Sequence, residues 1–247
     1  MRILLAICFF LSLHFYADAQ LTVDVDNPEA THGNYGAVKV YDPSAIGSKR
    51  VTVINYGDMH GSPFWNDKWA PALLYLNRGT IVKLKQVKMN LYTQEVHYLD
   101  NNGAELAAET GLVSKVVFLK AEDSTKVLSV FEARPDYTDN NGKAYFQVLD
   151  TGKVQLLLLQ KILRRQENYN ALSGKWESGF FSKYHYAISN NDRITPLTAL
   201  NPNTVTAAIS TDAVSKEWLR QNRNKLKNEA EVISFLDFYN GTHKPAK

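Results

Sequence analysis

The residues best placed to do chemistry are an aspartate and a histidine that follow a predicted strand. Residues 51–56 (VTVINY) have the β-branched and aromatic content typical of a strand, and Asp58-Met59-His60-Gly61 follows after a single glycine. Carboxylate and imidazole groups are common metal ligands, and an Asp-x-His pair at a strand end can bring both to one ion. A metal site is therefore one hypothesis for Asp58 and His60.

This pattern resembles the opening of the metal site in calcineurin-like metallophosphoesterases. Those enzymes also need a later Gly-Asp motif, an Asn-His-Glu/Asp motif and further clustered histidines, which this chain lacks. Beyond residue 19, four other histidines stand alone in the sequence: His32, His97, His185 and His243. We favour a tight loop in which Asp58 accepts hydrogen bonds from backbone amides and His60 is exposed or packs on Trp65. No metal and no cofactor is therefore expected.

Glu95 and His97 form a second candidate pair, because they alternate on one face of a predicted strand. They are either an acid/base pair or, as we favour, part of an exposed cross-strand surface. The signatures of serine hydrolases, zinc proteases, P-loop proteins and dinucleotide-binding proteins are absent from the sequence. The paired carboxylates of glycosidases are close in space rather than in sequence. A hydrolase whose site is not readable from the sequence therefore remains an alternative.

Three aromatic residues follow the Asp-x-His segment within a few positions: Phe64, Trp65 and Trp69. Clustered aromatics either form an exposed platform for a sugar or a protein, or plug the end of a sheet, which is the commoner outcome. With Asp58 and His60 they make up the candidate binding residues of this chain. No catalytic residue is assigned.

The start of the chain predicts secretion. Arg2 is followed by an almost wholly apolar run at residues 3–15, and Ala17-Asp18-Ala19 supplies the small residues that a signal peptidase recognises. The run is shorter than the roughly 20 residues of a membrane span. We therefore expect cleavage between Ala19 and Gln20, a mature chain without a transmembrane segment, and a place in the periplasm or on the outer surface of a bacterial cell.

Composition narrows the class of protein further. The only cysteine is Cys8, so the mature chain has neither disulfides nor a thiolate metal site. A net charge of +3 is too small to imply binding to nucleic acid or to an anionic membrane surface. With 45% hydrophobic and 21% charged residues, the chain is typical of a globular protein.

The middle of the chain reads as strands and turns. Residues 20–49 contain several prolines and glycines and predict an extended lead-in, whereas residues 50–192 predict an antiparallel β domain. In the strand at 80–92 the apolar phase switches across Lys85-Gln86, which predicts a β-bulge. The turn sequence Asp-Asn-Asn-Gly occurs at 100–103 and again at 139–142. Residues 164–178 are polar and rich in Asn, Gly and Ser, and predict a surface loop.

The C-terminal segment, residues 193–247, changes to helical periodicity. Asp212 is a candidate helix cap, and Asn228 with Glu231 resembles a capping box. Apolar residues then recur at positions 232, 235, 236 and 239, one face of a helix. The sequence therefore predicts a mainly β (α+β) fold: an antiparallel meander sheet or partly closed barrel with a small C-terminal helical appendage.

Several of these segments together resemble a group of uncharacterised secreted proteins of Bacteroidota. The resemblance rests on residues 61–67 (GSPFWND), residues 89–96 (MNLYTQEV), the strand at 154–159 and the terminal Phe238-Tyr239-Asn240. It covers about Gly61 to Asn240, with Met89 where tyrosine is expected. It implies an exported bacterial protein and transfers no activity or site residue.

The sequence thus favours a non-enzymatic binding or interaction module of the cell envelope or extracellular space. A protein, a glycan or a lipid of the envelope is the expected kind of partner. A hydrolase is one alternative. The other is a structural component of an envelope assembly, which would expose a sizeable apolar patch near Trp65 or on the C-terminal helices.

Overall fold

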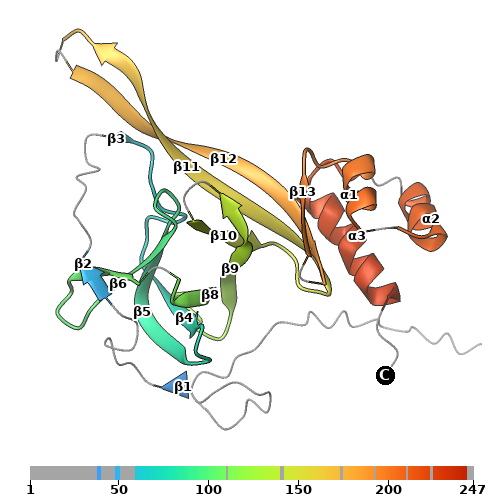
Figure 1. The fold of residues 1–247 in the computed structure, drawn as a ribbon, viewed down its shortest axis with the longest axis horizontal. Helices are drawn as coiled ribbons and strands as arrows, with labels where there is room; N and C mark the ends of the chain where they lie inside the picture. The colour runs from blue at the N-terminus through green and yellow to red at the C-terminus, as the bar shows by residue number, and fades with distance from the viewer. Residues whose placement is uncertain are drawn as a thin grey trace, which may run out of the picture.

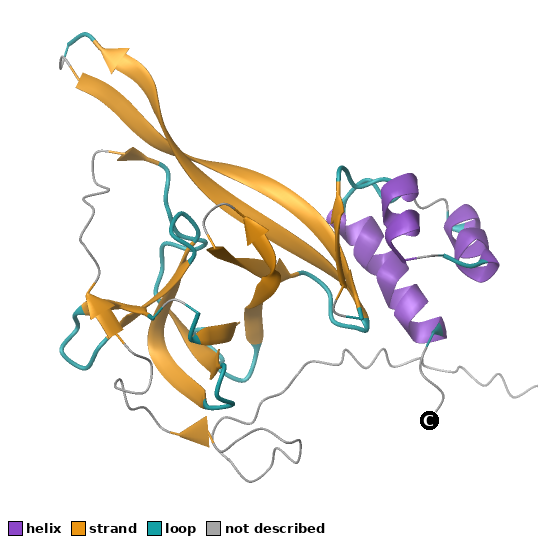
Figure 2. Cartoon of the chain, in the orientation of Figure 1, coloured by secondary structure: helices purple, strands orange, loops and turns teal. Residues whose placement is uncertain are grey.

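The computed structural model describes residues 38–39, 48–50, 59–109, 111–139, 142–172, 175–191, 193–209, 211–222 and 225–243. The predicted signal peptide, most of the predicted lead-in and the predicted strand at 51–56 lie outside these residues. Within them the predicted mainly β fold with C-terminal helices is confirmed (Figures 1 and 2). Among the described residues, no helix has the length and apolar content needed to cross a membrane.

The described residues form thirteen strands in one open sheet, followed by three helices. The strands are β1 (Val38–Lys39), β2 (Ser48–Arg50), β3 (Met59–His60), β4 (Ala70–Leu76), β5 (Ile81–Asn90), β6 (Glu95–Leu99), β7 (Glu105–Ala108), β8 (Val113–Leu119), β9 (Val127–Asp139), β10 (Gly142–Val148), β11 (Val154–Asn170), β12 (Lys175–Asn190) and β13 (Arg193–Leu197). The helices are α1 (Pro202–Ile209), α2 (Ala213–Gln221) and α3 (Glu229–Thr242). The segment predicted as helical therefore begins with a strand.

The sheet consists of two antiparallel meanders, β4 to β7 and β8 to β13, which meet where β8 pairs with β4. The short strands β1 and β3 add parallel pairs, with β5 and β12 respectively. We call strands β4 to β10 the body of the protein. Because neighbouring strands within each meander are also neighbours in sequence, short turns supply most of the connections.

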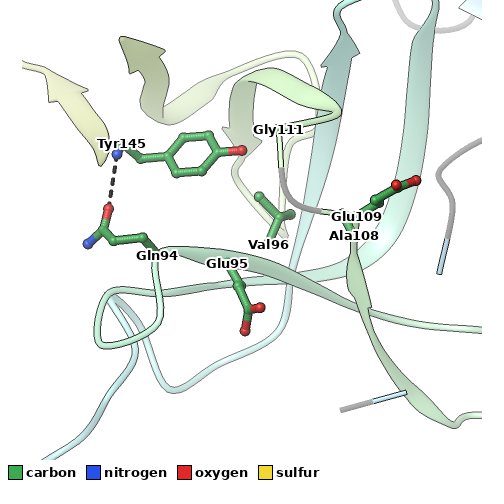
Figure 3. A pocket seen from close by; sticks show the side chains of 7 residues that line it. All are labelled: Gln94, Glu95, Val96, Ala108, Glu109, Gly111 and Tyr145. Atoms are coloured by element: carbon green, nitrogen blue, oxygen red, sulfur yellow. Dashed lines mark hydrogen bonds between the residues drawn. The ribbon is translucent and has the colours of Figure 1, made fainter. Parts of the chain in front are cut away.

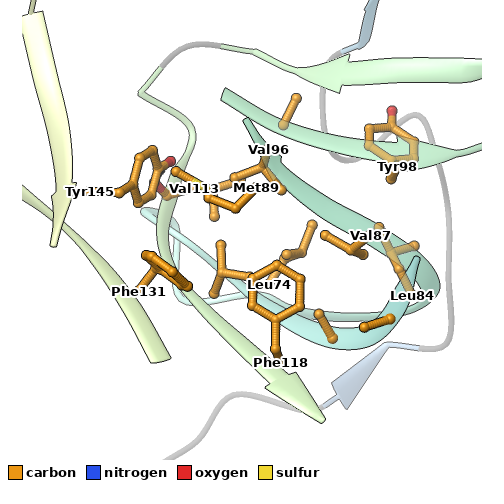
Figure 4. Close-up of a cluster of buried hydrophobic side chains, with 14 of the residues drawn as sticks. Leu74, Leu84, Val87, Met89, Val96, Tyr98, Val113, Phe118, Phe131 and Tyr145 are labelled. Carbon is orange, nitrogen blue, oxygen red and sulfur yellow. Dashed lines mark hydrogen bonds between the residues drawn. The ribbon is translucent and has the colours of Figure 1, made fainter. Parts of the chain in front are cut away.

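Strand β4 lies at the centre of the body and is buried on both faces. Leu74 lies in the main hydrophobic cluster with Phe118 and Phe131, whose rings meet edge to face at 5.9 Å (Figure 4). On the opposite face, Leu73 packs with Val117 in a second cluster. Burying each leucine fully stabilises the fold by about 1.5–3 kcal/mol. The near-continuous apolar sequence of β4 thus reflects a strand covered on both sides.

The predicted β-bulge in β5 is confirmed. Opposite β4, the register moves from Ala72↔Leu84 to Ala70↔Val87, so β5 contains one extra residue there. Lys85 and Gln86 are both exposed at that point, while Leu84 and Val87 are buried. The bulge therefore keeps the apolar residues on the core side across the phase switch.

The predicted hairpin turn at 100–103 is also confirmed. Gly103 has φ +79°, and the Asp100 carboxylate accepts hydrogen bonds from the backbone N–H groups of Asn102 and Ala104 at 2.8 Å. Glycine adopts this positive φ without steric cost. The turn connects β6 to β7.

The predicted surface loop at 164–178 is wrong. Strands β11 and β12 pair antiparallel from Val154↔Asn190 to Asn170↔Lys175, with one register shift after Gln166. The resulting hairpin extends well beyond the body (Figure 1). We call residues 160–172 and 175–185 the arm. Polar, Asn-rich residues have low strand propensity, but pairing with the partner strand overrides that local preference.

The three helices pack on the opposite end of the same hairpin. Phe235 and Leu236 of α3 join Leu156 of β11 and Ile188 of β12 in a buried cluster. The predicted caps are confirmed: Asp212 accepts from Ser215 N at 2.8 Å and Asn228 accepts from Glu231 N at 2.9 Å. Helices and hairpin therefore share one core.

A side chain of α3 completes the edge of β11 where that strand begins. Asn240 Oδ1 accepts from Val154 N at 2.9 Å, and Asn240 Nδ2 donates to Val154 O at 2.8 Å. The amide thus replaces a strand partner for Val154. A Cβ at Gly152 would clash with the side chain of Asn240, so the position of this amide depends on the glycine there.

Two aspartates face each other beside this contact. Asp150, in the turn before β11, is 7% exposed, and its Oδ2 has no hydrogen-bond partner among the described atoms. Burial, reinforced by the charge of Asp237 on α3, raises the pKa of Asp150 to about 7. The folded protein therefore holds a proton at Asp150 that the unfolded chain releases near pH 4.

We predict that stability falls as the pH rises from about 4 to about 7, because the unfolded chain ionises Asp150 over this range while burial beside Asp237 keeps it protonated in the folded state. The decline reaches up to about 1.4 kcal/mol per pH unit and levels off above the folded-state pKa. Asp150→Asn removes this part of the pH dependence. Urea unfolding of the unchanged protein and of Asp150→Asn at the two ends of this pH range measures the difference. An equal pH dependence of stability in the two proteins would contradict the raised pKa of Asp150.

Candidate functional site

The predicted aromatic residues cover the body near β5 and β6. Trp65 lies against Phe118 and Phe131, with ring centroids 5.2 and 5.3 Å apart, and packs on the main hydrophobic cluster. Its backbone N–H donates to Met89 O at 2.9 Å. Trp65 thus belongs to the packing of the body, as expected of an aromatic residue that plugs the end of a sheet.

Phe64 and Trp69 flank a lysine of β5. Lys88 Nζ lies 4.9 Å from the centroid of Phe64 and 4.6 Å from that of Trp69. Both rings are half-buried. An ammonium between two aromatic faces is held by cation–π attraction, so the outward-facing part of this cluster is already occupied by a side chain of the protein.

His97 lies beneath Phe64 and is 2% exposed. Its Nδ1 is 2.7 Å from Glu105 Oε1, and its Nε2 is 3.7 Å from Glu95 Oε2. The expectation that Glu95 and His97 form an exposed surface is therefore wrong for the histidine, because the ring of Phe64 packs edge-on against it at 5.6 Å. A buried imidazole lacks the access to a substrate that proton transfer requires.

Of the two residues of the Asp-x-His hypothesis, His60 alone is among the described residues, and it lies beside the arm. His60 belongs to β3, which pairs with Ser178 and Gly179 at the arm, and is exposed; Asp58 lies outside the described residues. Gly61 has φ +80°, and a Cβ there would lie 2.9 Å from Phe180 O. Among the described residues no group of three or more His, Cys, Asp or Glu side chains is arranged to hold a metal ion.

A small pocket opens between β6, β7 and β10, and two of its polar residues, Gln94 and Tyr145, are hydrogen-bonded within the fold (Figure 3). Gln94 Oε1 accepts from Tyr145 N at 2.9 Å, and Gln94 Nε2 donates to Leu91 O at 2.9 Å. Tyr145 Oη donates to Val113 O at 2.8 Å, and burial raises the pKa of that phenol. The pocket is lined by Gln94, Glu95, Val96, Ala108, Glu109, Gly111 and Tyr145. The phenol and the amide therefore serve the fold.

The arm presents exposed apolar side chains, which soluble surfaces usually scatter singly. Leu163 is 50% exposed, Tyr184 is 54% exposed, and Leu172 at the turn is fully exposed. Ile162 and Phe180, by contrast, are buried against the body and anchor the base of the arm. The arm therefore carries apolar surface outward from a firmly packed base.

Cations accompany these apolar residues. Arg164, Arg165 and Lys183 are exposed, and the Arg165 guanidinium carbon lies 4.1 Å from the centroid of Phe181. Lys161 and Lys183 are direct partners in the strand register, so two like charges share one face. The described side chains at 160–165 and 178–185 include four Lys or Arg residues and no carboxylate.

This surface was not among the predicted site residues. In the sequence, Lys161, Leu163 and Arg165 alternate with other residues, and this pattern indicates a strand with the three side chains on one face. The polar composition of the segment that follows favours a loop, and it outweighs this strand pattern.

The chain matches no protein-family model, no curated protein and no solved structure.

We predict that the two tryptophans differ in their contribution to stability. Trp65→Ala removes a ring that packs on Phe118 and Phe131, and should lower the free energy of unfolding by about 3 kcal/mol. Trp69→Ala removes mainly one cation–π contact with Lys88 and should cost about 1 kcal/mol. Urea denaturation of both variants provides the comparison, and equal losses would refute the distinction.

Proposed function

We propose that this chain is an exported, non-enzymatic interaction module that binds its partner through the arm. The observation that carries the proposal is the combination of exposed apolar and cationic side chains on a hairpin that extends beyond the body. Contact surfaces commonly combine aromatic and apolar residues with arginine, as Leu163, Tyr184 and Arg165 do here. Export rests on the predicted signal peptide at residues 1–19, and the resemblance to secreted Bacteroidota proteins agrees with it.

The absence of catalytic function in this proposal rests on the state of the candidate groups. His97 is enclosed by Phe64 and bonded to Glu105, and the polar groups of Gln94 and Tyr145 are engaged in the fold. Of the aromatic residues proposed from the sequence, Phe64 and Trp69 contact Lys88, and Trp65 packs on the core. The arm therefore offers a better binding surface than the Phe64–Trp69 loop does.

The proposal predicts that the arm is required for binding to native cell envelopes. The chain from Gln20 should sediment with envelope fractions of the source cell in a saturable manner. Leu163→Ser combined with Tyr184→Ser should weaken that binding at least tenfold, because both exposed apolar contacts are lost. Circular dichroism would establish that the variant is folded.

Two matched controls accompany this measurement. Val214→Ser removes an apolar side chain that is 58% exposed on α2, away from the arm, and should leave binding unchanged. Phe64→Ala combined with Trp69→Ala tests the loop suggested by the sequence. Loss of binding in the loop variant with retention in the arm variant would overturn the proposal in favour of the aromatic loop.

A further inference from the structure

One stretch of β12 has a strand on one side only. On the side away from β11, β3 pairs with β12 at residues 178–179, and β13 pairs with it at residues 186–190. Between them, no strand formed by the described residues pairs with β12 on that side. Residues 182–184 are all exposed. We call residues 181–185 the open edge.

The end of β3 leaves this edge open. Gly61 follows β3 with φ +80°, which ends the extended conformation. Two residues later, Pro63 O accepts a hydrogen bond from Leu91 N at 2.8 Å, so the segment is bonded to the body. Because β3 is parallel to β12, a longer β3 would have paired with the open edge.

The direction of the backbone groups along this edge follows from the contacts of β11. Gln160 O and Ile162 N are hydrogen-bonded to residues 91–94 of the body, so both point away from β12. In an antiparallel pair, directly opposite residues either bond to each other or both direct their backbone groups outward. Ser182 is opposite Ile162, and Tyr184 is opposite Gln160. The N–H and C=O groups of Ser182 and Tyr184 therefore point outward from the open edge.

The face of the arm that is turned away from the body is cationic along this edge. Ile162 and Phe180 are buried against the body, so odd-numbered residues occupy the opposite face. Lys183 lies on that face in the middle of the open edge, and the Arg165 guanidinium carbon lies 4.1 Å from the ring of Phe181. The described side chains of the arm include no carboxylate. An added strand with acidic residues on this face would therefore form opposite-charge pairs.

A lysine beside an open edge also restricts which strands can pair there. A neutral strand would cover Lys183 without giving it a partner, and a second arm would bring cations together. An acidic strand meets neither penalty. The charge of the edge therefore favours an extended segment with carboxylates at every second position.

We propose that the partner of the arm is an extended acidic peptide segment of another protein, which pairs with β12 as an added strand at the open edge. The inference rests on the proposed function, since it identifies the partner of the same surface. Hydrogen bonds to the backbone of Ser182 and Tyr184 supply affinity, and a carboxylate opposite Lys183 supplies specificity. The side chain of Tyr184, 54% exposed, packs on the residues of the segment that alternate with the carboxylates.

The test measures binding of a dye-labelled peptide, Thr-Glu-Val-Glu-Val-Glu-Thr with blocked ends, to the chain from Gln20 by fluorescence anisotropy. Ser182→Pro removes an outward N–H while leaving the hydrogen bonds between β11 and β12 in place, since proline is tolerated on edge strands. It should weaken binding about tenfold, because one hydrogen bond is lost and the ring obstructs the edge. Ser182→Ala removes only the hydroxyl and should change binding less than about twofold.

Charge is tested by Lys183→Glu, which should also weaken binding about tenfold because an attraction becomes a repulsion. Lys216→Glu reverses an exposed charge on α2, away from the arm, and should have little effect. Circular dichroism of each variant establishes that it is folded. Equal binding by the Lys183 and Lys216 variants would refute the proposed position of the peptide.

Strand pairing is distinguished from charge attraction by changing the peptide rather than the protein. Successive N–H groups of a strand point to opposite sides, so only every second one can bond to β12. One peptide carries N-methyl groups on its three glutamates, and another carries them on its two valines. One of the two should lose binding and the other should retain it. Equal binding of both peptides would show that no strand is added, and would overturn the inference.

Hydrogen exchange shows whether the edge is open in the free protein. The amides of Ser182 and Tyr184 should exchange fast in the free protein and slowly in the complex with the peptide. Slow exchange of both amides in the free protein would show that another part of the chain covers the edge, and would overturn the inference.

Binding to native envelopes separates this inference from the proposed function. Ser182→Pro should weaken envelope binding as the arm variant Leu163→Ser with Tyr184→Ser does. If the arm variant loses envelope binding and Ser182→Pro retains it, the peptide inference is wrong and the proposed function stands. If the arm variant itself retains envelope binding, both are wrong.

Discussion

The junction between β10 and β11 is the constraint on which the shape of this protein depends. These strands share only the register pairs Gln147↔Leu158 and Val148↔Leu157, and beyond them the ladder divides. The side chain of Gln94, a residue with φ +55°, bridges the two strands where they separate. Its amide oxygen accepts a hydrogen bond from Tyr145 N at 2.9 Å, and its amide nitrogen donates one to Gln160 O at 3.5 Å. Backbone groups of two diverging strands thereby gain partners without a third strand. Strand β10 can follow the body while β11 leaves it.

Strand β11 consequently serves three parts of the molecule in turn. At its start, Val154 bonds to Asn240 of α3; in its middle, Ile162 packs against the core of the body; at its end, it pairs only with β12 as the arm. The helical appendage and the arm are thus opposite ends of one hairpin, with the body beside its middle (Figure 1). Packing at two places along the strand gives the arm a rigid base, which suits a surface that must present side chains away from the body.

Features fixed by neighbouring residues could be predicted from the sequence. The β-bulge at Lys85-Gln86, the turn at Gly103 and the caps Asp212 and Asn228 all depend on contacts within a few positions. The arm could not be predicted in the same way, because its register is set by residues on the opposite strand and its local composition favours a loop. The burial of His97 likewise depends on Phe64, which lies more than thirty residues earlier in the chain. Contacts between residues far apart in the sequence therefore determine which candidate residues are exposed and which are buried.

The central claim is that residues 164–178 form a paired projection rather than a loop. Hydrogen exchange of the backbone amides in the free protein tests it directly, because cross-strand hydrogen bonds slow exchange and a loop does not. The register Arg164↔Phe180 and Gln166↔Ser178 predicts slow exchange at amides that alternate along both strands, declining toward the turn at Leu172. Uniformly fast exchange from residue 164 onward would contradict the arm and the binding surface built on it.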